Sequence, residues 1–164
     1  MDLRKFKLDE LLLAAIKSEI DSKEVYDKLA MKVKSSYMKQ RLEFLAGEEK
    51  KHKAFLETVF RDAFPNKKIE VPKKTPVPLP SFDVDDKSPY VSEVLEKAAN
   101  AEKAARDFYE TLAKRFDHDL EVKDGILHLA MMEEIHQKLI ELELDKIKAE
   151  EDYIIDWPMM HSGP

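Results

Sequence analysis

The sequence predicts an all-α protein built as a bundle of four long helices. The chain of 164 residues contains only three glycines, while strong helix formers such as Ala, Leu, Glu and Lys are abundant. Apolar residues recur at helical spacing along four long segments, and one proline-rich stretch interrupts them near the middle of the chain. This length suits a single domain with a sizeable core.

The first two predicted helices cover residues 8–33 and 36–60. Ser36 is the expected N-cap of the second one. The apolar stripe of the first helix consists of Leu12, Ala15, Ile16, Tyr26 and Leu29, and that of the second of Leu42, Leu45, Phe55 and Val59.

The third and fourth predicted helices cover residues 88–116 and 119–150. Ser88 and Pro89 read as an N-cap followed by proline at the first helical position. Gly125 lies inside the fourth pattern and weakens the prediction of where that helix begins. The stripe of the fourth helix consists of Ile126, Leu129, Ile140 and Leu144.

Residues 62–87 break the helical rhythm because they hold five prolines, which no regular helix tolerates. We interpret this stretch as a crossover linker between two antiparallel helical hairpins. A helix of about 25 residues is roughly 37 Å long, a distance that the extended linker can cover. The expected organisation is therefore one bundle over residues 1–150, with the linker inside it, and a C-terminal tail over residues 151–164. The tail is apolar enough to fold back onto the bundle or to dock on a neighbouring subunit.

The two halves of the chain repeat each other. At a shift of 83 positions, Glu19 aligns with Glu102 and Tyr26 with Tyr109. At a shift of 84 positions, the second helix aligns with the fourth, pairing Leu45 with Leu129, Glu49 with Glu133 and His52 with His136. The chain therefore reads as a doubled helical hairpin.

Two Glu-x-x-His motifs lie at equivalent positions of this repeat, Glu49 with His52 and Glu133 with His136. Positions three apart share a helix face, so each pair points a carboxylate and an imidazole in one direction. One copy would mean little, because such a pair arises readily by chance. Two copies at matched positions of the apolar stripes predict a metal site.

Glu19 and Glu102 complete the pattern, since each lies at the middle of its helix on the inward stripe. A buried carboxylate is costly without a partner, and no Lys or Arg lies on either stripe. Cations are the natural compensation, and four glutamates balance two divalent ions. Oxygen and imidazole ligands accept iron, manganese or a mixed pair. The weaker alternative is a polar bundle whose glutamates are merely solvated.

One glutamate from each of two helices, with Glu-x-x-His from each of the other two, is the signature of ferritin-like di-iron and di-manganese proteins. The sequence resembles the rubrerythrin branch of this superfamily. That resemblance implies a ferritin-like four-helix bundle holding two iron ions. Glu49 and Glu133 would be the bridging ligands, Glu19 and Glu102 the terminal carboxylates, and His52 and His136 the imidazole ligands.

The resemblance implies a non-haem di-iron oxidoreductase that reduces hydrogen peroxide or dioxygen as it oxidises ferrous iron, a peroxidase or ferroxidase of the oxidative-stress response. The chain lacks the four cysteines of the family's rubredoxin-like domain. Electrons are therefore expected from a separate donor protein. It also lacks the family's extra glutamate on the third helix, having Ala99 and Ala105 one turn either side of Glu102. The resemblance therefore does not extend to the part of the family's peroxidase mechanism in which that extra glutamate takes part. Tyr26 and Tyr109 are either plain core aromatics or residues of the site, where they would donate a hydrogen bond or act as redox-active phenols.

Two other functions remain open: an iron-storage ferroxidase subunit of a closed cage, and a structural or metal-buffering bundle stabilised by its metal. We expect a homodimer, in which the long linker would permit exchange of hairpins. A net charge of −6 gives no reason to expect nucleic acid. The longest apolar run, residues 11–16, is too short to span a membrane, and the N-terminus lacks a secretory signal, so the expected location is cytoplasmic.

Overall fold

The computed structural model describes residues 3–74, 77 and 91–155, with side chains as far as residue 149. These residues form four α-helices and no strand, which confirms the predicted all-α, ferritin-like four-helix bundle. The helices are α1 (Leu8–Lys32), α2 (Ser36–Ala63), α3 (Val91–Leu112) and α4 (Leu120–Ile155), and a short 3₁₀ helix, η1 (Ala113–Phe116), follows α3.

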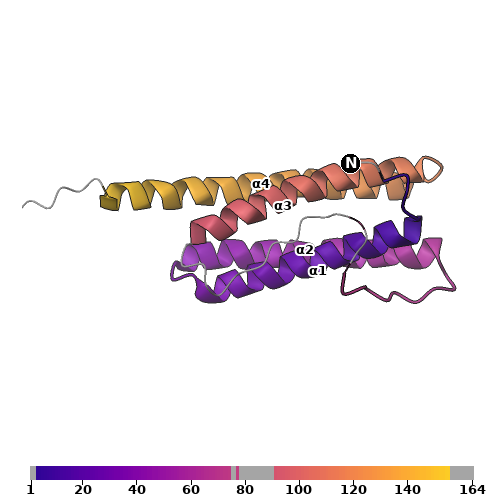
Figure 1. Cartoon of the computed structure of the whole chain (residues 1–164), viewed down its shortest axis with the longest axis horizontal. Coiled ribbons are helices and arrows are strands. Elements are labelled where there is room, and N and C mark those ends of the chain that lie inside the picture. The colour runs from indigo at the N-terminus through magenta and orange to yellow at the C-terminus, as the bar shows by residue number, and fades with distance from the viewer. Residues whose placement is uncertain (1–2, 75–76, 78–90, 156–164) are drawn as a thin grey trace, which may run out of the picture.

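The four helices form two antiparallel hairpins, α1 with α2 and α3 with α4 (Figure 1). α2 ends at one end of the bundle and α3 begins at the other. The end of α2 and the start of α3 are therefore separated by about the length of the bundle, which is the distance that the predicted crossover has to cover. Residues 64–74 of this linker contain no helix, and most of its remainder lies outside the described residues, as does the predicted N-cap at Ser88 and Pro89.

Helix boundaries differ from the sequence prediction in several places. Ser35, rather than Ser36, is the N-cap of α2, and its hydroxyl accepts a hydrogen bond from the Met38 amide at 3.3 Å. α2 continues to Ala63, and the last four residues of the predicted third helix tighten into η1. α4 continues to Ile155, so the first five residues of the predicted tail are helical. The other tail residues, 156–164, lie outside the described part of the chain.

Gly125 interrupts the pattern of α4 because an aromatic ring from α2 lies against it. A Cβ atom at Gly125 would overlap the ring of Phe55. Phe55 is only half-buried, although the sequence pattern placed it in the core. Leu56 and Phe60 are the fully buried side chains of this part of α2. The glycine thus permits α2 and α4 to pack closely at this point.

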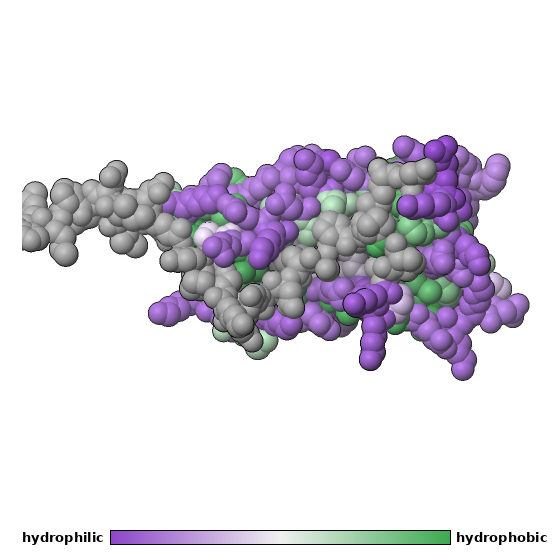
Figure 2. Space-filling view, in the orientation of Figure 1, coloured by the Kyte–Doolittle hydropathy of each residue, from purple (hydrophilic) through white to green (hydrophobic). Residues whose placement is uncertain are grey.

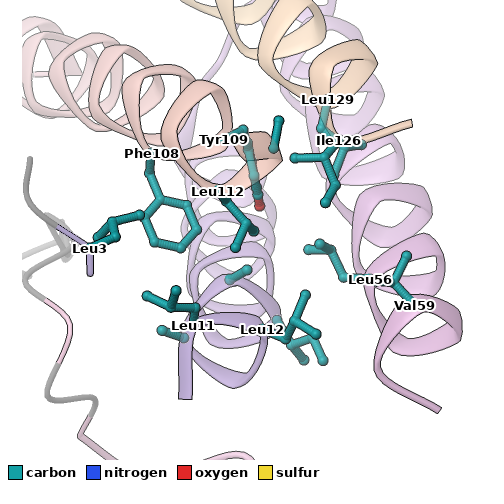
Figure 3. Packing of buried hydrophobic residues seen from close by; sticks show 14 of the residues in the cluster. Leu3, Leu11, Leu12, Leu56, Val59, Phe108, Tyr109, Leu112, Ile126 and Leu129 are labelled. Carbon is teal, nitrogen blue, oxygen red and sulfur yellow. The ribbon is translucent and has the colours of Figure 1, made fainter. Parts of the chain in front are cut away.

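The core consists of two apolar clusters, one toward each end of the bundle. The first contains Leu12 and Ile16 of α1 with Leu56 of α2, and Figure 3 shows its close packing around Tyr109 of α3. The second contains Leu29, Leu42, Leu95 and Ile140, one from each helix. The middle of each helix lies between the two clusters, and it is there that the charged residues of the inward stripes occur.

Outside the core, hydrophilic side chains cover most of the described surface seen in Figure 2. Among the described residues, no helix combines the length and the apolar character that a membrane crossing requires.

Candidate metal centre

All six predicted ligands meet at the middle of the bundle. Each of the six residues is at most 4% exposed. α1 contributes Glu19 and α3 Glu102, while α2 contributes Glu49 with His52 and α4 Glu133 with His136. Within each Glu-x-x-His pair the helical spacing brings the carboxylate 3.4 Å from the Nδ1 atom of its own histidine.

Glu49 and Glu133 lie between the two imidazoles, and we call them the central carboxylates. Glu49 is 3.4 Å from Nδ1 of His52 and 3.3 Å from Nδ1 of His136. Glu133 is 2.9 Å from Nδ1 of His52 and 3.4 Å from that of His136. The two rings stack with their centroids 5.4 Å apart. Each central carboxylate thus reaches both histidines, as a bridging ligand would.

Glu19 and Glu102, the outer carboxylates, each approach one histidine only. Glu19 lies 3.4 Å from Nδ1 of His52, and Glu102 lies 3.9 Å from Nδ1 of His136. This is the arrangement expected of terminal ligands, one at each end of the site.

Each outer carboxylate accepts a hydrogen bond from a tyrosine of the opposite hairpin. The Tyr26 hydroxyl on α1 donates to Glu102 on α3, and the Tyr109 hydroxyl on α3 donates to Glu19 on α1. Both tyrosines are fully buried. Of the two readings of these residues, the structure therefore supports partners of the site over plain core aromatics. The internal repeat explains why the two bonds are equivalent.

Many polar atoms at the centre have no hydrogen-bond partner among the described residues. They include both ring nitrogens of His52 and of His136, both oxygens of Glu133, and one oxygen each of Glu19 and Glu49. Several of these atoms are within hydrogen-bond distance of one another but lack hydrogen-bond geometry. Buried polar atoms almost always have partners. Buried carboxylate oxygens and imidazole nitrogens that converge while their hydrogen bonds stay unsatisfied are what a cation site looks like.

Burial and mutual repulsion set the protonation of the carboxyl groups. Burial first, and then the charges of Glu49 and Glu133, raise the pKa values of Glu19 and Glu102 well above their ordinary range. Burial alone would also raise the pKa values of the central carboxylates. Their close contacts with the outer carboxyl groups and with the imidazoles outweigh that effect and hold both pKa values low.

The imidazoles and phenols respond to the same negative charges. Burial opposes protonation of His52 and His136, but the neighbouring carboxylates prevail, raising the pKa to about 12 for His52 and about 9 for His136. Burial, followed by the charge of the nearby carboxylate, raises the pKa values of Tyr26 and Tyr109 well above 10. Both phenols therefore keep their protons and act as donors.

The metal-free site is thus neutral through four protons, two on the outer carboxyls and two on the imidazoles. Two divalent cations would supply the same positive charge once those protons leave. Glu49, His52, Glu133 and His136 each offer a ligand atom, and these atoms all lie within 4.8 Å of one another. Carboxylate oxygens and imidazole nitrogens suit iron and manganese. The residues present therefore fit a two-metal site.

The other described histidines, and the small residues near Glu102, lie apart from this constellation, while His161 lies outside the described residues. His118 and His128 are exposed, so neither belongs to the site. Ala98 and Ala99 belong to the second apolar cluster, and Ala105 packs against the first. The alanines around Glu102 therefore serve close packing of α3. Sequence reasoning missed no member of the buried cluster within the described residues.

The chain is a four-helix bundle with paired carboxylates and histidines at its centre. These features place it in the class of ferritin-like proteins with a candidate metal-binding core. The chain belongs to the rubrerythrin family, whose sequence model matches residues 10–87 and 93–158. A solved structure of a hypothetical protein from Pyrococcus furiosus is similar, with 34% identity and a TM-score of 0.77. That match covers 88% of this chain and 92% of the other. No curated protein matches the chain significantly.

Proposed function

We propose that this protein is a di-iron oxidoreductase that reduces hydrogen peroxide or dioxygen and draws its electrons from a separate donor protein. The observation that carries the proposal is the buried set of unpartnered carboxylate and imidazole atoms at the centre of the bundle. Membership of the rubrerythrin family supports iron as the metal. Two bound ferrous ions would supply the two electrons that turn hydrogen peroxide and two protons into two waters.

The ligand residues bind and orient the metal pair. Glu49 and Glu133 lie between the two imidazoles and are placed to be shared, while Glu19 and Glu102 close the two ends. All six side chains come from the middle of long helices that pack on both sides of the site. This rigid support holds the ligands in place through a change of metal charge.

Tyr26 and Tyr109 position the outer carboxylates and hold a proton close to the site. Each phenol stays protonated, because burial and the adjacent carboxylate raise its pKa. The apolar clusters above and below exclude bulk water, so substrates are limited to small molecules. Hydrogen peroxide and dioxygen meet that limit.

The donor of electrons is proposed to be a second protein because this chain has no cysteine. Without thiolate ligands this chain cannot hold a cysteine-ligated iron centre that would pass electrons to the site. A soluble one-electron carrier docking on the bundle would have to reduce the site between turnovers.

Anaerobic titration with Fe²⁺, followed by peroxide, tests the proposal. Two ferrous ions per chain should bind, and one equivalent of peroxide should oxidise both, which absorption in the near ultraviolet would report. Glu102→Ala should lower both the metal content and the peroxide consumption, while Glu134→Gln, a change at the exposed neighbour of Glu133, should alter neither. Unchanged metal content in Glu102→Ala would contradict the ligand assignment. Uptake of far more than two irons per chain by a closed cage would instead identify a storage protein.

A further inference from the structure

The outer side of α4 carries a row of exposed apolar side chains that the metal site does not use. Five large apolar residues on this helix are between 40% and 68% exposed. We call them the outer stripe: Leu120, Leu127, Met131, Ile135 and Leu142. At about 100° per residue, all five point within about 40° of the direction of Met131. Glu133 and His136 point to the opposite side, into the core.

The internal repeat provides a comparison within the same chain. α2 and α4 are equivalent helices, with matching ligands at a shift of 84 positions. The positions of α2 that correspond to the outer stripe are Ser36, Glu43, Gly47, Lys51 and Thr58. Every one of these is polar or lacks a side chain. An apolar outer face is thus not needed to build this helix, and on α4 it requires a separate reason.

The outer stripe is symmetric about Met131. Leu127 and Ile135 lie four residues on either side of it, and Leu120 and Leu142 lie eleven residues on either side. Three, four, seven and eleven residues are the spacings that return to one face of a helix. If two copies of α4 pair antiparallel with the two-fold axis at Met131, Leu127 meets Ile135 and Leu120 meets Leu142.

The charged residues beside the stripe obey the same symmetry. Asp124 and Lys138 lie seven residues before and after Met131, so the antiparallel pairing places each opposite the other. His128 and Glu134, three residues before and after Met131, also face each other. Lys138 also contacts Glu134 of its own helix at 2.5 Å. At these four pairs of positions, apolar residues thus meet apolar ones and each acid meets a basic side chain. Self-complementarity of this kind is what an isologous interface requires.

We propose that the outer stripe of α4 is the interface of a homodimer, in which two copies of α4 pack antiparallel about a two-fold axis through Met131. The stripe runs over about 33 Å of helix from Leu120 to Leu142. It leaves both hairpins of each chain intact, so the dimer needs no exchange of hairpins. The interface lies on the side of α4 away from the metal ligands, and it holds whether or not the proposed redox function does.

The absence of cysteine from the chain permits a direct test of the register. In the full-length protein, Met131→Cys puts two thiols across the axis. Facing Cα atoms of helices about 8–10 Å apart come within the range of a disulfide. Leu127→Cys alone puts the two thiols of the dimer about 12 Å apart along the helix direction, which is too far for a disulfide. We expect Met131→Cys to form a covalent dimer on mild oxidation, Leu127→Cys to stay monomeric on a non-reducing gel, and Leu127→Cys with Ile135→Cys to form the dimer again.

Controls make each outcome decisive. Met31→Cys, at a residue of α1 that is 76% exposed, measures random collision. Met131→Glu puts two charges on the axis and should convert a dimer to a folded monomer, which the solution mass and the circular dichroism would show. Equal cross-linking of the Met31 and Met131 variants overturns the proposal. So does a monomeric mass for the unmodified protein, in which case the stripe serves the chain's own tail or another partner, and so does cross-linking of Leu127→Cys alone.

Discussion

Loading the metal-free protein with Mn²⁺ under anaerobic conditions is expected to release about four protons per chain near pH 6. The number follows from the charge state of the site. Burial and the neighbouring charges raise the pKa values of Glu19 and Glu102, and carboxylate neighbours raise those of His52 and His136 to about 12 and about 9. These four groups carry protons before binding. Ligands must be deprotonated to bind metal, so two divalent ions displace all four.

Calorimetric titration in two buffers of different ionisation enthalpy measures the released protons directly. Mn²⁺ avoids the additional protons that oxidation of iron would involve. In Glu102→Gln one of the four protons is absent from the start, so the release should fall to about three. Glu134→Gln is the matched control, because the pKa of that exposed carboxyl is lowered by Lys138 and it carries no proton at this pH.

The pH dependence gives the reasoning a second check. Above pH 9 the metal-free protein has already lost the proton of His136, so fewer protons remain to be displaced and the measured release should decrease. Release of fewer than two protons near pH 6, or a release that Glu102→Gln leaves unchanged, would refute the assigned protonation of the site.

The further predictions concern stability, and each is measured by unfolding of the metal-free protein unless stated. Tyr26→Phe removes the donor to the buried Glu102 and should cost about 1–2 kcal/mol, with a control change at the exposed Tyr37 costing less. Gly47→Ala should stabilise by about 0.5–1 kcal/mol, because nothing lies within 4 Å of the new methyl. Gly125→Ala should be less stable than Gly47→Ala by about 1–3 kcal/mol, since its methyl meets the ring of Phe55. Equal effects of the two glycine changes would contradict this packing. The raised histidine pKa values stabilise the metal-free fold below pH 6.5, and this contribution is lost as pH rises through about 9 and 12. The metal-free melting temperature should therefore fall between pH 7 and 10, while the gain on adding Mn²⁺ grows. A metal-free melting temperature that rises over this interval would contradict the assignment.

The sequence predicted the fold, and it predicted that the six candidate ligands lie together, because both depend on periodic spacing. The stripes of α1 and α4 are buried as expected, and the matched Glu-x-x-His pairs converge because their helices are long and regular. Glu19 and Glu102 could be identified because an unpaired carboxylate on an apolar stripe contradicts the pattern around it. Properties that repeat every 3.6 residues can be read from the sequence without knowledge of the tertiary structure.

Features that depend on contacts with neighbouring helices, or on the exact backbone conformation, could not be predicted from the sequence. Adjacent serines at positions 35 and 36 both suit an N-cap, and only the backbone shows that Ser35 holds that place. The pattern placed Phe55 in the core, whereas its ring lies half-buried over Gly125 of another helix. The hydrogen bonds of Tyr26 and Tyr109 cross between hairpins, so no spacing within one helix could have distinguished them from core aromatics.

The metal site is also where the two hairpins are joined. Contacts between helices are extensive within each hairpin and sparse between α1 and α3 or between α2 and α4. At the centre, however, His52 of α2 reaches Glu133 of α4, and Tyr109 of α3 reaches Glu19 of α1. Every metal ion shared by the central carboxylates would therefore be bound by both hairpins at once. Because binding to the native arrangement alone stabilises it, an ion at 100 times its dissociation constant would add about 2.7 kcal/mol to the association of the hairpins. The residues that would bind the metal pair are thus also the ones that would hold the two halves of the repeat together.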